Sequence, residues 1–89
     1  MPSLSRDFTI PNAKGLHARA ATAFVKVASA FDANVIVRRG PTTANGKQIM
    51  MLLILAAPQG CVVKIETDGP QAQDAMDALG ALIEAGFGE

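Results

Sequence analysis

The spacing of apolar residues changes repeatedly along this chain of 89 residues, and this change constrains the fold more than any other feature. Residues 4–10 alternate between apolar and polar side chains, with Arg6 as a charged exception, which is typical of a half-buried strand. Residues 18–31 instead repeat apolar side chains at three- and four-residue steps, which predicts an amphipathic helix. A turn-forming segment at 11–15 separates the two patterns. Such a chain is expected to pack a helix against a sheet.

The rest of the chain continues these two patterns. The β-branched run at 35–37 predicts a second strand, and residues 42–44, which follow a Gly-Pro turn, predict a third. The Leu- and Met-rich segment 47–57 ends at a proline and predicts a short helix. Residues 61–67 alternate again and predict a fourth strand, after which Pro70 is expected at the first position of a last helix.

The predicted order is therefore β-α-β-β-α-β-α, with Gly86 as the stop of the last helix. We expect an α+β fold in which a four-stranded, mainly antiparallel sheet carries all three helices on one face and exposes the other face to water. Residues 1–89 contain no linker or repeat and are expected to form a single domain. Asn45-Gly46 is interpreted as a plain turn, and Gly80, inside the last helix, has no functional explanation from the sequence.

Composition excludes several classes of partner and site. The 8 Lys and Arg residues balance 8 Asp and Glu residues, which argues against nucleic acid as a partner. The longest apolar run, at 49–57, is far shorter than the ~20 residues that span a bilayer, so no membrane partner is expected. One cysteine and one histidine exclude a disulfide and a Cys/His metal site. Residues 1–7 lack the apolar core of a signal peptide, and a cytoplasmic location is expected.

The single histidine, His17, falls where the turn at 11–15 leads into the first predicted helix. Backbone N–H groups at a helix N-terminus lack partners and bind anions such as phosphate, so the backbone of Ala18 and Arg19 is a candidate phosphate cradle. The positive end of the helix dipole favours the neutral, nucleophilic imidazole. The Arg19 guanidinium can bind phosphate oxygens in a bidentate geometry. Gly15 allows the backbone to turn sharply before the site.

A nucleophilic imidazole beside a phosphate cradle predicts that His17 accepts a phosphoryl group. Hydrolysis is not favoured, because the segment offers no second base to activate water and so small a domain has little room for a substrate cleft. The alternative interpretation is that His17 is only a turn residue and Arg19 only a solvated charge. The one cysteine, Cys61, is interpreted as a small buried hydrophobe rather than a reactive thiol.

The predicted helix at 47–57 carries apolar residues on more than one of its faces. A short helix on a small sheet buries only one face, so part of this apolar surface should be exposed and available to a partner. Ile49, Met50 and Leu53 form one candidate patch by their three- and four-residue spacing. The alternative is that this helix is deeply buried.

The segment Gly15-Leu16-His17-Ala18-Arg19 resembles the active-site motif of HPr, the phosphocarrier of the bacterial phosphoenolpyruvate-dependent phosphotransferase system. The resemblance runs over nearly the whole chain. Residues 47–50 (Lys-Gln-Ile-Met) resemble the family's Lys-Ser-Ile-Met helix start. Residues 31–33, 69–71 and 86–89 resemble the nitrogen-type branch of the family.

The resemblance implies an open-faced β-sandwich with the order given above and no cofactor. It implies that Enzyme I phosphorylates His17 on Nδ1 and that the group passes to an Enzyme IIA protein. Arg19 would steady the phosphate, and Ile49, Met50 and Leu53 would lie in the docking surface for both partners. A carrier that presents one face to successive partners is expected to be a monomer and not a free-standing enzyme.

Two positions depart from the family pattern. Ala20 stands where the family has proline, and it restores an N–H group to the first turn of the helix. Gln48 stands at the position of the family's regulatory serine and has no hydroxyl to phosphorylate. The sequence leaves open whether the pathway serves sugar uptake or nitrogen-type regulation. A competing hypothesis is a regulatory module that signals only through docking of the 47–57 helix, and a metabolic enzyme is the weakest of the three hypotheses.

Overall fold

The computed structural model of the chain describes residues 3–88. The elements follow the predicted order β-α-β-β-α-β-α and end in a short 3-10 turn. The strands are β1 (Ser3–Thr9), β2 (Asn34–Arg39), β3 (Thr42–Asn45) and β4 (Val62–Asp68). The helices are α1 (Ala18–Ala28), α2 (Ile49–Leu55) and α3 (Ala72–Glu84), followed by η1 (Gly86–Gly88).

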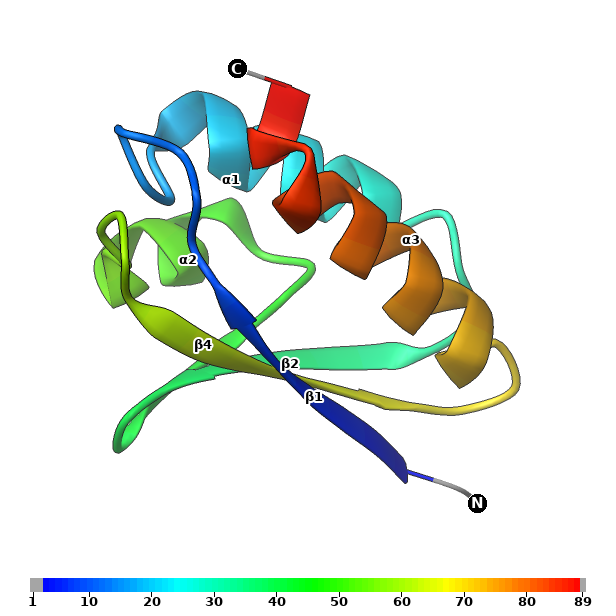
Figure 1. Cartoon of the computed structure of the whole chain (residues 1–89). Helices are drawn as coiled ribbons and strands as arrows, with labels where there is room; N and C mark the ends of the chain where they lie inside the picture. The colour runs from blue at the N-terminus through cyan, green and yellow to red at the C-terminus, as the bar shows by residue number, and fades with distance from the viewer. Residues whose placement is uncertain (1–2, 89) are drawn as a thin grey trace.

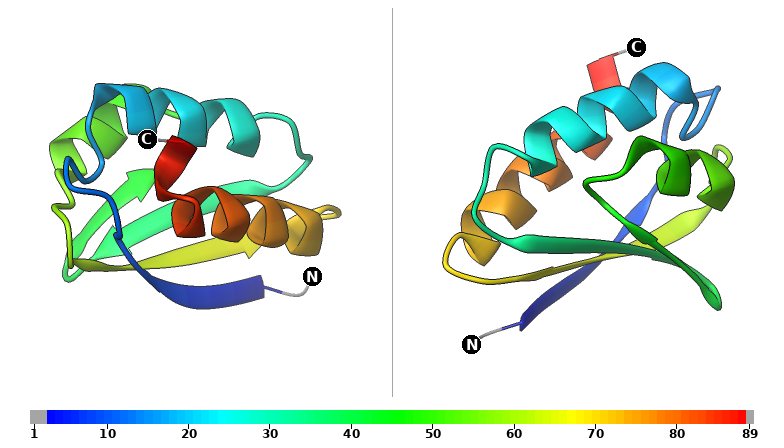
Figure 2. Two further views of the ribbon diagram at one scale, coloured as in Figure 1. Left: turned by 45° about the horizontal axis from the view of Figure 1, so that its top comes forward. Right: turned by 180° about the vertical axis from the view of Figure 1, so that it is seen from behind.

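The four strands form one sheet in the order β1-β4-β2-β3, and every neighbouring pair is antiparallel. All three helices cover the same face of this sheet, and the other face is open (Figure 1, Figure 2). The predicted α+β fold, with its antiparallel sheet and its helices on one face, is therefore confirmed.

The core lies between the helices and the covered face of the sheet. In β4, Val63, Ile65 and Thr67 are almost fully buried and alternate with more exposed neighbours, as a strand covered on one face requires. Phe24 of α1 and Leu79 of α3 pack into the same core. The charged exception in β1, Arg6, remains exposed, and its guanidinium lies 4.8 Å from the centroid of the Phe8 ring.

The predicted ends of the elements need correction. The first helix ends at Ala28 instead of residue 31, and the helix predicted at 47–57 covers only Ile49–Leu55. Lys47 lies in the turn before α2, where its backbone N–H donates to Asn45 Oδ1 at 2.9 Å. Pro70 precedes α3, whose N-cap is Gln71.

The first strand, predicted over residues 4–10, covers Ser3–Thr9. Ser3 lies opposite Asp68, and residues 1–2 lie outside the described part of the chain. At the other end of the chain, Gly86 follows the C-cap of α3 with φ +68°, as its predicted role as a stop requires.

Two glycines have packing roles that the sequence did not indicate. A Cβ on Gly46 would lie 2.4 Å from a methyl carbon of Val35 and 2.9 Å from the Phe24 ring, so the interpretation as a plain turn was incomplete. A Cβ on Gly80 would lie 3.1 Å from two ring carbons of Phe8. Gly80 therefore lets α3 lie close to β1, which offsets its cost inside a helix.

Candidate functional site

His17 is the N-cap residue of α1, with an extended backbone at φ −83° and ψ −177°. The carbonyl of His17 accepts a hydrogen bond from the amide N–H of Ala21 at 2.8 Å, and this is the first hydrogen bond of the helix. The N–H groups of Ala18, Arg19 and Ala20 precede this bond and have no acceptor within the helix. His17 therefore lies where the sequence analysis expects it, at the N-terminus of α1, and anion binding by these N–H groups stays a prediction.

The His17 imidazole is half-buried, and its Nδ1 lies 3.1 Å from the carbonyl oxygen of Gly15. A carbonyl oxygen can only accept, so a hydrogen bond here requires a proton on Nδ1. In the neutral ring that tautomer places the lone pair on Nε2. Reaction at Nδ1 therefore requires this proton to leave and the ring to turn away from the Gly15 carbonyl.

The loop before His17 is held by contacts within itself and to the segment after α2. Gly15 has φ +61°, and its carbonyl also accepts the Asn12 side-chain amide at 2.8 Å. The Leu16 N–H donates to the Ala57 carbonyl at 2.8 Å. Asn12 is buried, and the sequence reasoning missed it, because an asparagine after a proline indicates no more than a turn.

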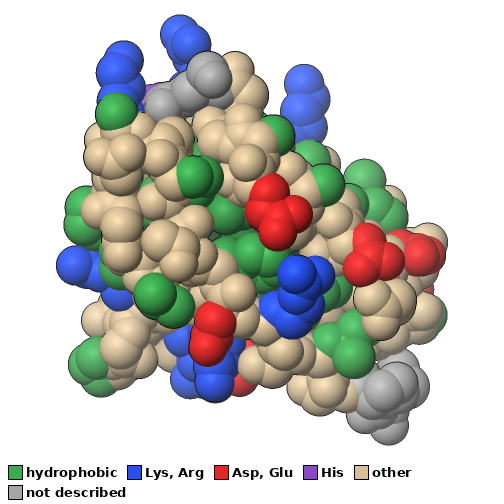
Figure 3. All heavy atoms as spheres, viewed as in Figure 1, with side chains coloured by type: hydrophobic (Ala, Val, Ile, Leu, Met, Phe, Trp, Pro, Cys, Tyr) green, Lys and Arg blue, Asp and Glu red, His purple; other side chains and the backbone are tan. Residues whose placement is uncertain are grey.

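Arg19 lies in the first turn of α1, where its side chain is exposed and makes no ion pair within residues 3–88. Figure 3 shows basic side chains projecting at the top of the molecule, over the start of α1 and the loop before it. Ala20 has no exposed surface, so the residue that replaces the family's proline packs its methyl group into the core. The structure thus leaves the Arg19 guanidinium in solvent near the helix N-terminus.

The second predicted feature, the apolar surface of α2, is exposed in part. Leu52 and Leu55 are buried, whereas Met50 is 68% exposed and Ile54 is 74% exposed. The expectation that this helix is not fully buried agrees with these values. Ile49 is also exposed, and Leu53 is half-buried.

Ile54 and Met51 were not among the predicted surface residues, although both are exposed. Ile54 lies four residues after Met50 and three after Met51, but this spacing indicates an exposed face only when the buried side of the helix is known. We call the exposed apolar residues of this helix the α2 patch: Ile49, Met50, Met51 and Ile54, with half-buried Leu53 between them. Gln48 is the N-cap of α2, and its side chain makes no capping hydrogen bond.

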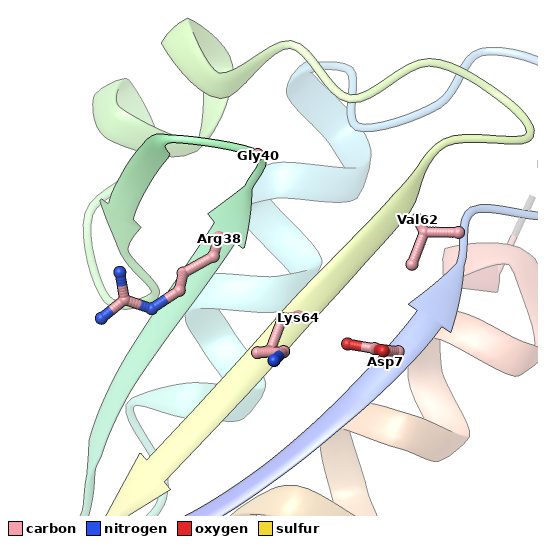
Figure 4. Close-up of a pocket in the computed structure, with 5 residues that line it drawn as sticks. All are labelled: Asp7, Arg38, Gly40, Val62 and Lys64. Carbon is pink, nitrogen blue, oxygen red and sulfur yellow. The ribbon is translucent and has the colours of Figure 1, made fainter.

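A hollow of about 300 Å³ lies on the open face of the sheet and not beside His17. It is lined by Asp7, Arg38, Gly40, Val62 and Lys64, which Figure 4 shows on the strands β1, β2 and β4 and the turn after β2. Over residues 3–88, no group of three or more potential metal ligands lies together. None of the described helices is long and apolar enough to cross a membrane.

A family model and the sequences of known proteins point to the same family. The family model described as "PTS HPr component phosphorylation site" matches residues 4–85. The phosphocarrier protein HPr of Cupriavidus necator is 48% identical over 86 residues, which cover 97% of each chain. The phosphocarrier protein NPr of Shewanella violacea is 39% identical and covers 100% of this chain and 98% of its own.

A solved protein structure is also similar to this chain in fold and sequence. The crystal structure of HPr-C-His from Thermoanaerobacter tengcongensis has a TM-score of 0.90 and 39% sequence identity, and the match covers 100% of this chain and 98% of that one.

Proposed function

Because this chain belongs to the HPr family of phosphocarrier proteins, we propose that it carries a phosphoryl group on His17. Phosphorylated Enzyme I is the proposed donor and an Enzyme IIA protein is the proposed acceptor. The observation that carries the proposal is the position of the chain's one imidazole at the N-cap of α1. No cofactor is needed, because the phosphoryl group arrives already activated on the donor protein.

The proposed step is a transfer between two proteins without water. A ring nitrogen of His17 attacks the phosphorus, the new N–P bond forms, and the bond to the donor breaks with its electron pair left on Enzyme I. For attack from Nδ1, the proton that faces the Gly15 carbonyl must first leave, and the neutral ring then carries its proton on Nε2. The 3.1 Å contact between Nδ1 and Gly15 is thus made in the resting state and lost on transfer.

The start of α1 is proposed to stabilise the phosphoryl oxygens. The N–H groups of Ala18 and Arg19 lie in the first turn, and the positive end of the helix dipole favours a negative group there. Ala20 adds a third N–H in place of the family's proline. The exposed guanidinium of Arg19 is proposed to pair with phosphoryl oxygens in a bidentate geometry.

The α2 patch is proposed as the docking surface for both partners. Met50 and Ile54 expose large apolar side chains, which a soluble domain of this size rarely leaves unpartnered when they lie together. Ile49 and Leu53 extend the same surface. The formal net charge of zero indicates that docking depends more on this patch than on long-range attraction.

The proposal also covers the state, location and regulation of the protein. The protein acts as a monomeric relay component in the cytoplasm, not as a free-standing enzyme. Regulation through a serine in front of α2 is absent, because Gln48 occupies that position. Both HPr and NPr proteins are among its relatives, so the branch of the pathway is assigned by identifying the Enzyme IIA protein that it phosphorylates.

The test is incubation with Enzyme I and phosphoenolpyruvate, followed by quantification of acid-labile phosphate on the protein. We expect one phosphoryl group per chain in the wild type and none in His17→Ala. Label that persists in His17→Ala refutes the assignment. The competing hypothesis, a module that acts through docking alone, predicts instead that the wild type takes up no phosphate while Met50→Glu abolishes partner binding.

A further inference from the structure

The segment between α2 and β4, residues 56–61, lies against the loop that leads into His17, residues 10–16 (Figure 1, Figure 2). Four hydrogen bonds join them: Ile10 N–H to Cys61 O at 2.9 Å, Leu16 N–H to Ala57 O at 2.8 Å, Gln59 Nε2 to Pro11 O at 3.0 Å, and Gly60 N–H to Ile10 O at 2.8 Å. Gly15 fits so closely against this segment that a Cβ there would lie 2.3 Å from the Ala57 oxygen. A shift of residues 57–60 must therefore move the residues that precede His17.

One side chain joins the two ends of this supporting segment. Arg39 Nη1 donates to the carbonyl oxygens of Leu55 at 3.2 Å and Ala56 at 3.5 Å. Its Nε lies 3.2 Å from the Sγ atom of Cys61. Arg39 is the last residue of β2 and has the same strand parity as the buried Val37, so it points toward the helices.

The segment needs such a clamp for two physical reasons. Carbonyl groups at the C-terminus of α2 have no partners within the helix and carry the negative end of its dipole, and α2 has no basic residue in its last turn. Arg39, from β2, supplies the positive charge at this end of α2. In addition, Ala56 caps α2 with φ +52°, a left-handed conformation that costs a non-glycine residue energy and must be held by its surroundings.

We propose that Arg39 is a positioning residue for His17: by clamping residues 55–61 it fixes the loop that orients the imidazole. The influence passes from Arg39 to the Ala56–Ala57 backbone, then to Gly15 and Leu16, and then to the Nδ1 contact of His17. Its consequence for phosphoryl transfer rests on the proposed function, whereas its effect on the loop does not.

The test compares Arg39→Gln with Arg38→Gln, which removes the same charge from the neighbouring residue. Arg38 is a matched control, because its Nε pairs with Glu66 at 2.7 Å on the open face of the sheet. We expect amide hydrogen exchange at Leu16 to accelerate about tenfold in Arg39→Gln, through local opening of the bond to Ala57, and to stay unchanged in Arg38→Gln. The ¹⁵N chemical shifts of the His17 ring should change only in Arg39→Gln.

The rate of phosphorylation by Enzyme I is measured on the same proteins. We expect about a tenfold loss in Arg39→Gln, a partial recovery in Arg39→Lys, which keeps a charged donor for the Leu55 and Ala56 carbonyls, and no loss in Arg38→Gln. Equal Leu16 exchange and equal His17 shifts in the two glutamine variants overturn the proposal, whatever the rates. If the wild type takes up no phosphate, the proposed function fails, and the exchange and shift measurements still decide the role of Arg39.

Discussion

Replacement of Gly15 by alanine should destabilise the fold through a single contact. The new Cβ would lie 2.3 Å from the Ala57 carbonyl oxygen, whereas an ordinary contact needs at least 3.4 Å. Relief of this clash requires a separation of about 1 Å, which lengthens the Leu16–Ala57 hydrogen bond from 2.8 Å to about 3.8 Å and breaks it. Loss of this bond leaves a buried donor unsatisfied, at about 2 kcal/mol. The left-handed backbone at φ +61° adds about 1 kcal/mol for a residue with a Cβ.

Gly40→Ala is the matched control, because Gly40 has φ +57° and a Cβ there would meet nothing within 4 Å. It should cost only the backbone term of about 1 kcal/mol, against about 3 kcal/mol for Gly15→Ala. The free energy of unfolding is measured by urea titration with circular dichroism, since the chain has no Trp or Tyr to report by fluorescence. A difference below about 0.5 kcal/mol between the two variants would refute the reasoning that Gly15 is required by its contact with Ala57.

Five further substitutions give four separate tests. Leu52→Ala should lower the free energy of unfolding by about 3 kcal/mol because Leu52 is fully buried, whereas Ile54→Ala on the same helix should change it by less than about 0.5 kcal/mol; urea titration measures both. Met50→Glu should weaken binding to Enzyme I at least about tenfold in a titration calorimeter while leaving the melting temperature within about 3 °C, and unchanged affinity would remove Met50 from the docking surface. Gln48→Ser should raise the free energy of unfolding by about 0.5–1 kcal/mol, because serine caps a helix that lacks a side-chain cap, and a destabilised variant would contradict this. Thr67→Val should cost about 1–2 kcal/mol, because the buried Thr67 hydroxyl donates to the Ala72 carbonyl at 2.9 Å, and a neutral result would show that this bond contributes nothing.

The order of the elements could be predicted because each apolar pattern reports its own local geometry. The alternation in β4 and the three- and four-residue spacing around Phe24 both correspond to buried faces in the structure. Strand neighbours were not predictable in the same way. β1 pairs with β4, about 60 residues away in sequence, and both strands lie against α3; no local pattern encodes that partnership.

The site was predictable only in part for a similar reason. The position of His17 at the start of α1 could be predicted, because a turn followed by helical spacing has a local signature. Arg39 was not, because its role depends on contacts with Leu55 and Cys61 that chain spacing does not show. In α2, every residue of Ile49–Leu55 is apolar, so the sequence could not indicate that Ile54 faces solvent while Leu55 is buried.

A chase of labelled phosphate through the protein tests directly whether it acts as a carrier. The chain is first labelled with Enzyme I and radioactive phosphoenolpyruvate, separated from the donor, and mixed with an Enzyme IIA protein. We expect label to leave this chain and appear on Enzyme IIA in the wild type, and we expect His17→Ala neither to take up label nor to pass it on. Transfer to Enzyme IIA that proceeds through His17→Ala, or label that stays on the wild type without transfer, would contradict the claim that this protein is a carrier acting through His17.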